Sequence, residues 1–139
     1  MSHRKWPSRR AILGGGIAAM ALPILAPVLG AQQACSSEFR SLCGMAGRFF
    51  SSAGSAAEIG HAYLALTADE ASPDALAARL LEGRGDLAEA VGRADYDGFV
   101  SALRSAVRAD RERGELVMLD SWLLPVTEVR LCAVIALSI

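Results

Sequence analysis

The apolar run at the end of the chain constrains the fold more than any other stretch. Residues 127–139 are strongly apolar, and Pro125 separates them from the equally apolar segment 115–124, because proline disfavours helix for the residue before it. A helix that is apolar almost all round needs burial on every side. We therefore expect this helix, which begins at Val126 or Thr127, to be central to the domain, to pack on another protein, or to belong to a truncated chain.

The residues before this run show helical periodicity. Apolar side chains recur at helical spacing in segments 36–50, 55–68, 72–82 and 95–109, with a shorter segment at 87–91. A capping box, Ser55 to Glu58, predicts where the second helix begins, and Pro73 suits the first helical position of the third. No strand pattern competes and no repeat is present. The sequence predicts an all-α fold, a compact bundle of five or six short helices after an N-terminal signal helix.

The first 34 residues have the features of an export signal. Arg9 and Arg10 stand directly before the uncharged segment 11–31, whose glycines and prolines keep it mildly hydrophobic. The arginine pair indicates the twin-arginine route. We therefore divide the chain into a signal peptide, residues 1–34, and a helical domain, residues 35–139. Two alternatives stay open, because segment 11–31 could span a bilayer as a retained anchor and Cys35 could be a lipoprotein cysteine.

Charge and size limit the functions of the domain. Residues 35–139 contain ten arginines, no lysine and fifteen carboxylates, so the domain is acidic and offers a poor surface for nucleic acid. The 105 residues suffice for one small domain, which is marginally stable without help from cross-links or partners.

The residues that could carry chemistry are few. Cys35, Cys43 and Cys132 are an odd number of thiols, so they are buried small hydrophobes, free thiols or partners in a disulfide. On one helix Cys35 and Cys43 would lie ~12 Å apart, which is beyond bridging distance. A lone His61 is more often an ordinary side chain than a ligand. We predict no catalytic residue, no metal site and no cofactor in this chain.

The twin-arginine signal is unexpected on a domain as small as this one. The twin-arginine route carries folded proteins, yet this domain is short and shows no cofactor motif of its own. We infer that it travels with something that must fold or bind its cofactor in the cytoplasm. Trp122 is either a core residue or an interface anchor, since tryptophan is enriched in binding hot spots.

Two stretches resemble a known family. Segment 119–133 has a tryptophan, a short link, Thr127-Glu128 and an apolar helix. Segment 39–81 has a helix that ends near a Gly or Ser break and then a helix that contains Gly-His-Ala-Tyr-Leu-Ala-Leu at 60–66. Both are similar to the small subunits of exported, membrane-bound flavin-dependent sorbitol, fructose and related alcohol dehydrogenases. Family members also carry a twin-arginine signal, and they generally continue beyond the apolar helix that ends here at Ile139.

The resemblance implies a role without catalysis. In that family a large flavoprotein holds FAD and oxidises the sugar or alcohol, and a multihaem cytochrome c subunit passes electrons to the quinone pool. The small subunit binds the flavoprotein, and its signal takes the loaded partner through the twin-arginine translocase to the periplasm, where the complex is membrane-associated. We expect the partner interface to come from apolar and aromatic residues, namely Phe49, Phe50, Tyr63, Trp122, Leu131, Val134 and Leu137.

Two other functions remain open at this stage. One is a helical periplasmic binding or structural protein, held by an uncleaved signal and without an enzyme partner. The other is a small thiol protein or enzyme that uses Cys43, Cys132 or His61, which would require a reactive thiol.

Overall fold

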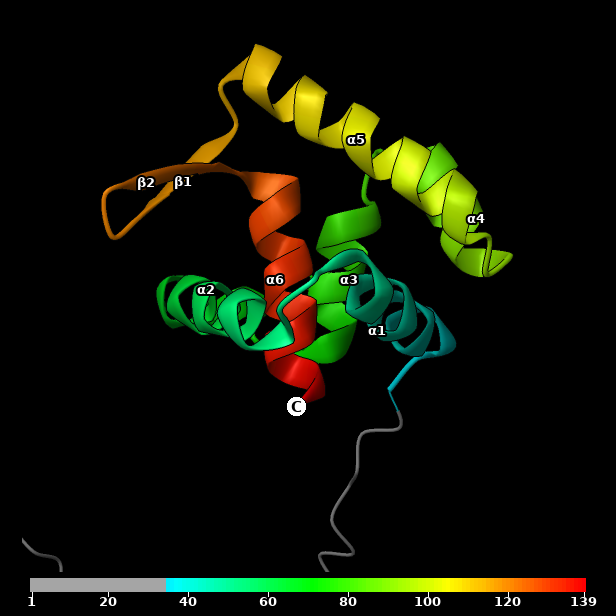
Figure 1. The fold of residues 1–139 in the computed structure, drawn as a ribbon, viewed down its shortest axis with the longest axis horizontal. Coiled ribbons are helices and arrows are strands. Elements are labelled where there is room, and N and C mark those ends of the chain that lie inside the picture. The colour runs from blue at the N-terminus through cyan, green and yellow to red at the C-terminus, as the bar shows by residue number, and fades with distance from the viewer. Residues whose placement is uncertain (1–34) are drawn as a thin grey trace, which may run out of the picture. The chain divides into compact units, whose positions relative to one another are not determined.

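The helices surround a single central helix. The computed structural model describes residues 35–139, so the predicted signal with Arg9 and Arg10 lies outside the described residues. The central helix is α6 (Val126–Ser138), whose residues 131–136 are all buried. It packs against α1 (Ser37–Phe49), α2 (Ala53–Leu66), α3 (Pro73–Leu81) and α5 (Tyr96–Arg113). Figure 1 shows α6 in red between these elements. The apolar final helix is thus central to the domain, which is one of the three outcomes expected from the sequence.

The predicted all-α class is confirmed, with six helices in the described part of the chain. α4 (Gly85–Gly92) packs on α5, and a short 3-10 turn, η1 (Ala68–Glu70), links α2 to α3. α3 begins as predicted, with Pro73 in its first turn and the hydroxyl of Ser72 accepting the N–H of Ala75 at 3.3 Å. α5 begins after Asp95 and continues to Arg113, four residues beyond the predicted end, because Gly114 takes the left-handed conformation there.

The predicted capping box of the second helix is wrong. α2 begins at Ala53, and the residue that caps it is Ser52, whose hydroxyl accepts the N–H of Ser55 at 3.3 Å. Two serines in succession offered two starting points, and the earlier one adds a further turn to the helix. Ser55 accepts a hydrogen bond from the Ser52 hydroxyl instead of capping.

The expectation that no strand is present is also wrong. β1 (Leu116–Leu119) and β2 (Trp122–Pro125) form an antiparallel hairpin that leads directly into α6. Two residues, Asp120 and Ser121, make the turn, and both have positive φ values, 45° and 70°. Positive φ at both central residues is the backbone of a type I′ turn, the form that suits the twist of paired strands.

α2 and α6 approach each other closely at Gly60. A Cβ built on this glycine would lie 2.6 Å from the carbonyl carbon of Cys132 and 2.8 Å from the Cα of Ala133. Both are backbone atoms, which cannot swing aside as a side chain can. The absence of a side chain at Gly60 therefore sets the distance between the two helices.

Candidate functional site

The hairpin exposes large apolar side chains. Trp122 is 72% exposed, Met118 64% and Leu123 55%. Met118 pairs with Leu123 across the two strands, so their side chains lie on one face, while Leu119 and Trp122 pair on the other. We call these three exposed residues the hairpin patch, in which Trp122 lies on the face toward α2 and Met118 and Leu123 lie on the opposite face. Three large apolar side chains exposed on one short hairpin make it a candidate protein interaction site.

Trp122 borders a hollow between the hairpin and α2. The hollow has a volume of about 470 Å³, and its apolar wall comes from Ile59, Ala62, Leu119 and Leu124. Glu58 and Asp120 stand at its edge. The hollow is large enough to receive an aromatic or branched side chain from another molecule.

The residues expected at an interface lie in different places. Tyr63 is 3% exposed, and Leu131 and Val134 are fully buried, so these three side chains pack inside this chain and do not offer surface to a partner. Phe49, Phe50 and Leu137 are partly buried against the core. Trp122 is exposed on the hairpin rather than in the core. Trp122 is therefore accessible to a partner, whereas the apolar residues of α6 pack within the domain.

Sequence reasoning names neither Met118 nor Leu123 as an interface residue. Both belong to the apolar segment 115–124, for which the sequence analysis predicts no hairpin. The signal that could have revealed them is the pair Asp120-Ser121 between two short apolar runs, since two turn-forming residues between such runs predict a hairpin.

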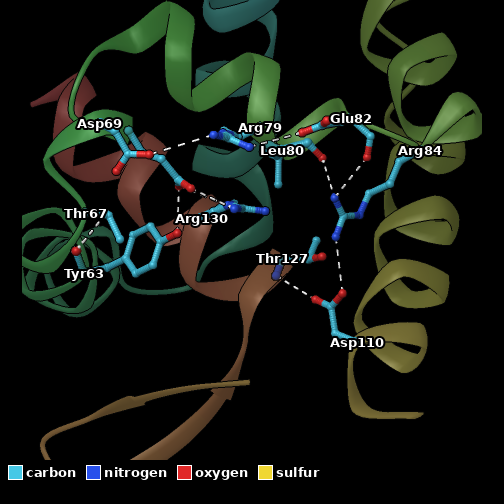
Figure 2. A network of polar contacts seen from close by, with 11 residues as sticks. Tyr63, Thr67, Asp69, Arg79, Leu80, Glu82, Arg84, Asp110, Thr127 and Arg130 are labelled. Carbon is cyan, nitrogen blue, oxygen red and sulfur yellow. Dashed lines mark hydrogen bonds and ion pairs between the residues drawn. The ribbon is translucent and has the colours of Figure 1, made fainter. Parts of the chain in front are cut away.

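A buried carboxylate holds the first turn of α6. Asp110 on α5 is 1% exposed, and its carboxylate accepts the N–H of Thr127 at 2.7 Å and a hydrogen bond from Arg84 at 3.3 Å. Figure 2 shows Asp110 facing both partners. The N-terminal N–H groups of a helix have no partner within it and carry partial positive charge, so a carboxylate there is favourable. Asp110 therefore fixes the position at which the hairpin ends and α6 begins.

A second buried carboxylate holds α6 from the other side. Arg130 donates two hydrogen bonds to Glu70, at 3.0 and 2.8 Å, and Tyr63 donates one at 2.7 Å (Figure 2). Burial opposes the charge of Glu70, but the hydrogen bonds from Arg130 and Tyr63 outweigh it and hold the pKa of Glu70 below its ordinary value of 4.5. Burial and the hydrogen bond to Glu70 raise the pKa of Tyr63. These contacts give Tyr63 and Glu70 a structural explanation that requires no catalytic role.

Two of the cysteines, Cys43 and Cys132, have raised pKa values. All three described cysteines are free, and Cys132 is buried. Burial, with a further contribution from Glu128, raises the pKa of Cys132 to about 12. Burial and then the nearby Cys35 raise the pKa of Cys43 to about 11. Because the thiolate is the reactive form, neither Cys43 nor Cys132 has the environment of a reactive cysteine at neutral pH.

The described residues gather no metal site, and His61 lies exposed on α2. Between residues 35 and 139, none of the helices combines the length and the apolar character that crossing a bilayer requires. No protein-family model, curated protein sequence or solved structure matches the chain.

Proposed function

We propose that this chain is a non-catalytic small subunit that binds a large flavin-dependent sugar or alcohol dehydrogenase and escorts it through the twin-arginine export route. FAD belongs to the large flavoprotein in this proposal, and a multihaem cytochrome c completes the complex at the periplasmic side of the membrane. The observation that carries the proposal is the hairpin patch, in which Trp122 is 72% exposed on one face of the hairpin and Met118 and Leu123 are exposed on the other.

The position of the patch suits a partner of defined orientation. The hairpin continues directly into α6, and buried carboxylates hold α6 at its first turn and at Arg130. Binding through Trp122 costs little backbone entropy, because the hairpin that carries this residue is already ordered. Exposed apolar residues would also make the domain poorly soluble without its partner, so a well-behaved monomer of the isolated chain would count against the proposal.

The direct test is co-expression of the full chain with a flavoprotein subunit of this dehydrogenase family from the same genome. A tag on the small chain should recover the flavoprotein, measured by flavin absorbance in the purified fraction. Trp122→Ala combined with Leu123→Ala should weaken binding by ~2 kcal/mol or more, roughly 30-fold. Leu66→Ala with Ile139→Ala removes two other exposed apolar side chains and serves as the control, with binding retained.

Export supplies the second arm of the test. Replacing Arg9 and Arg10 by lysine should leave the flavoprotein in the cytoplasm, still bound to the small chain. A flavoprotein that reaches the periplasm with this variant, or without the small chain, would end the escort proposal. Full-length chain found in membranes without any flavoprotein would favour the anchored binding protein instead.

A further inference from the structure

A groove runs along α5 at a distance in sequence from the hairpin patch. Two hollows, with volumes of about 360 and 680 Å³, share Phe49, Arg104 and Arg108 as lining residues. Together they extend from Tyr96 to Arg111, which is ~22 Å along a helix that rises 1.5 Å per residue. None of their lining residues belongs to the hairpin patch, so this is a separate surface.

The bottom of the groove is apolar and firmly supported. Leu103 and Leu131 are buried beneath it, and Phe49 and Val107 are half-buried at its sides. Phe49 packs edge-to-face on Phe50 with the ring centres 5.3 Å apart. A ligand in the groove therefore meets a fixed apolar strip.

One side of the groove carries arginines without carboxylate partners. Arg104, Arg108 and Arg111 are exposed, and none forms an ion pair with a described residue, whereas Arg79, Arg84, Arg93 and Arg130 each do. Their spacing, i, i+4 and i+7, places them on one face of α5. The described domain has more acids than bases overall, yet three guanidinium groups without an ion pair to a described carboxylate gather here beside an apolar strip.

Other charges border the same groove. Arg48 stacks on the ring of Tyr96, 3.9 Å from its centre, near one end. Asp97 lies at that end, and Glu128 lies opposite the arginines at the other. An anionic membrane surface would be repelled by these two carboxylates. A ligand with carboxylates on one edge and a basic group on the other would satisfy both sides.

We propose that this groove binds an amphipathic α-helix of a partner protein, with carboxylates on the edge that faces α5 and a basic residue on the edge that faces Glu128. A helix lying along α5 presents its own i, i+4 and i+7 positions at the spacing of Arg104, Arg108 and Arg111, and its apolar stripe meets the strip beneath Phe49. Arginine forks pair with carboxylates in two parallel hydrogen bonds, which adds orientation to attraction. The proposal does not require the dehydrogenase partner.

The test uses the full chain and a labelled synthetic helix. The peptide carries leucines on its apolar face, three glutamates at i, i+4 and i+7 on one edge and an arginine on the other; a control peptide has glutamine at the three acidic positions. By fluorescence anisotropy at low salt, we expect the glutamate peptide to bind roughly tenfold more tightly, the combined effect of three exposed ion pairs. Raising the salt to about 0.5 M should shrink this difference.

Matched variants locate the site. Arg104→Gln with Arg108→Gln and Arg111→Gln should abolish the preference for the glutamate peptide, with an unchanged helical circular dichroism spectrum. Arg40→Gln with Arg79→Gln and Arg93→Gln removes the same charge from exposed positions outside the groove and should keep the preference.

Three results would overturn the proposal. Equal affinity for the two peptides, or a preference that survives in the groove variant, would show that the arginines do not select the ligand. If the protein shows no peptide preference but binds phosphatidylglycerol vesicles, and the groove variant loses this binding, the surface would be assigned to a membrane. A dimer of the full chain that the groove variant dissociates would assign it to a second copy.

Discussion

Replacing Gly60 by alanine tests the packing on which the whole domain depends. The added methyl group would lie 2.6 Å from the carbonyl carbon of Cys132 and 2.8 Å from the Cα of Ala133. Carbon atoms pack best at about 3.5–4.0 Å, so α2 and α6 must separate by ~1 Å at their crossing. The movement cannot be absorbed by a rotamer change, because the opposing atoms belong to the backbone of the central helix.

The expected cost follows from two opposing effects. Alanine favours helix over glycine by ~1 kcal/mol, so the substitution would stabilise α2 if it had room. Overpacking a closely fitted interior costs typically ~1–3 kcal/mol and sometimes more, and here it also disturbs the neighbouring buried residues of α6. Because the opposing atoms are backbone, we expect a cost near the upper end, ~3 kcal/mol. After the gain of ~1 kcal/mol, Gly60→Ala should be ~2 kcal/mol less stable, equivalent to a lowering of Tm by roughly 10 °C in a domain of this size.

The assay is urea and thermal unfolding followed by circular dichroism, which reports the helices directly. Gly44→Ala is the matched control, since Gly44 lies on α1 with nothing within 4 Å of an added Cβ, and it should stabilise by up to ~1 kcal/mol. A Gly60→Ala protein as stable as the Gly44→Ala protein would refute the close approach of α2 and α6.

Three further predictions concern individual residues. Glu70→Gln should lower the free energy of unfolding at neutral pH, and the difference from wild type in urea unfolding should shrink as the pH falls below about 4.5. The reason is that a carboxylate whose pKa is lowered on folding contributes stability above that pH and loses it on protonation. Cys43 and Cys132, with pKa values raised to about 11 and 12, should resist iodoacetamide at neutral pH in the native protein and react in urea, as mass spectrometry can show; rapid native labelling would revive the thiol hypothesis. Ser121→Gly should raise the free energy of unfolding by ~0.5–1 kcal/mol, because glycine adopts the positive φ of this turn position without strain; an unchanged denaturation midpoint would count against the type I′ turn.

Much of the helical framework could be predicted from local signals. Ser72 and Asp95 cap helices through their own side chains, and such caps depend on residues three positions apart. The burial of α6 followed from its composition, since no solvent-facing side of such a helix would be stable. These features need no knowledge of distant parts of the chain.

The contacts that position the candidate sites depend on distant residues and were not predicted. Asp110 and Thr127 are separated by 17 positions, and Glu70 and Arg130 by 60, so their pairing exists only once the helices have packed. The hairpin was missed for a different reason. Its strands are four residues long and apolar on both faces, which hides the alternation by which a half-buried strand is recognised. The groove along α5 was also not predicted, because its sides come from α1, α5 and α6, which are distant in sequence.

The residues from which we inferred a resemblance to dehydrogenase small subunits divide into two kinds in this structure. Gly60 and Tyr63 have roles inside the domain, one permitting the approach of α6 and the other donating to Glu70. Any helical domain with this packing would need these two residues, so their presence is explained by the fold and does not require a partner. Trp122 differs, because its 72% exposure gives it no comparable role within the chain. Stability measurements on Gly60 variants and binding measurements on Trp122 variants therefore address separate claims, and of these two only the second bears on the escort proposal.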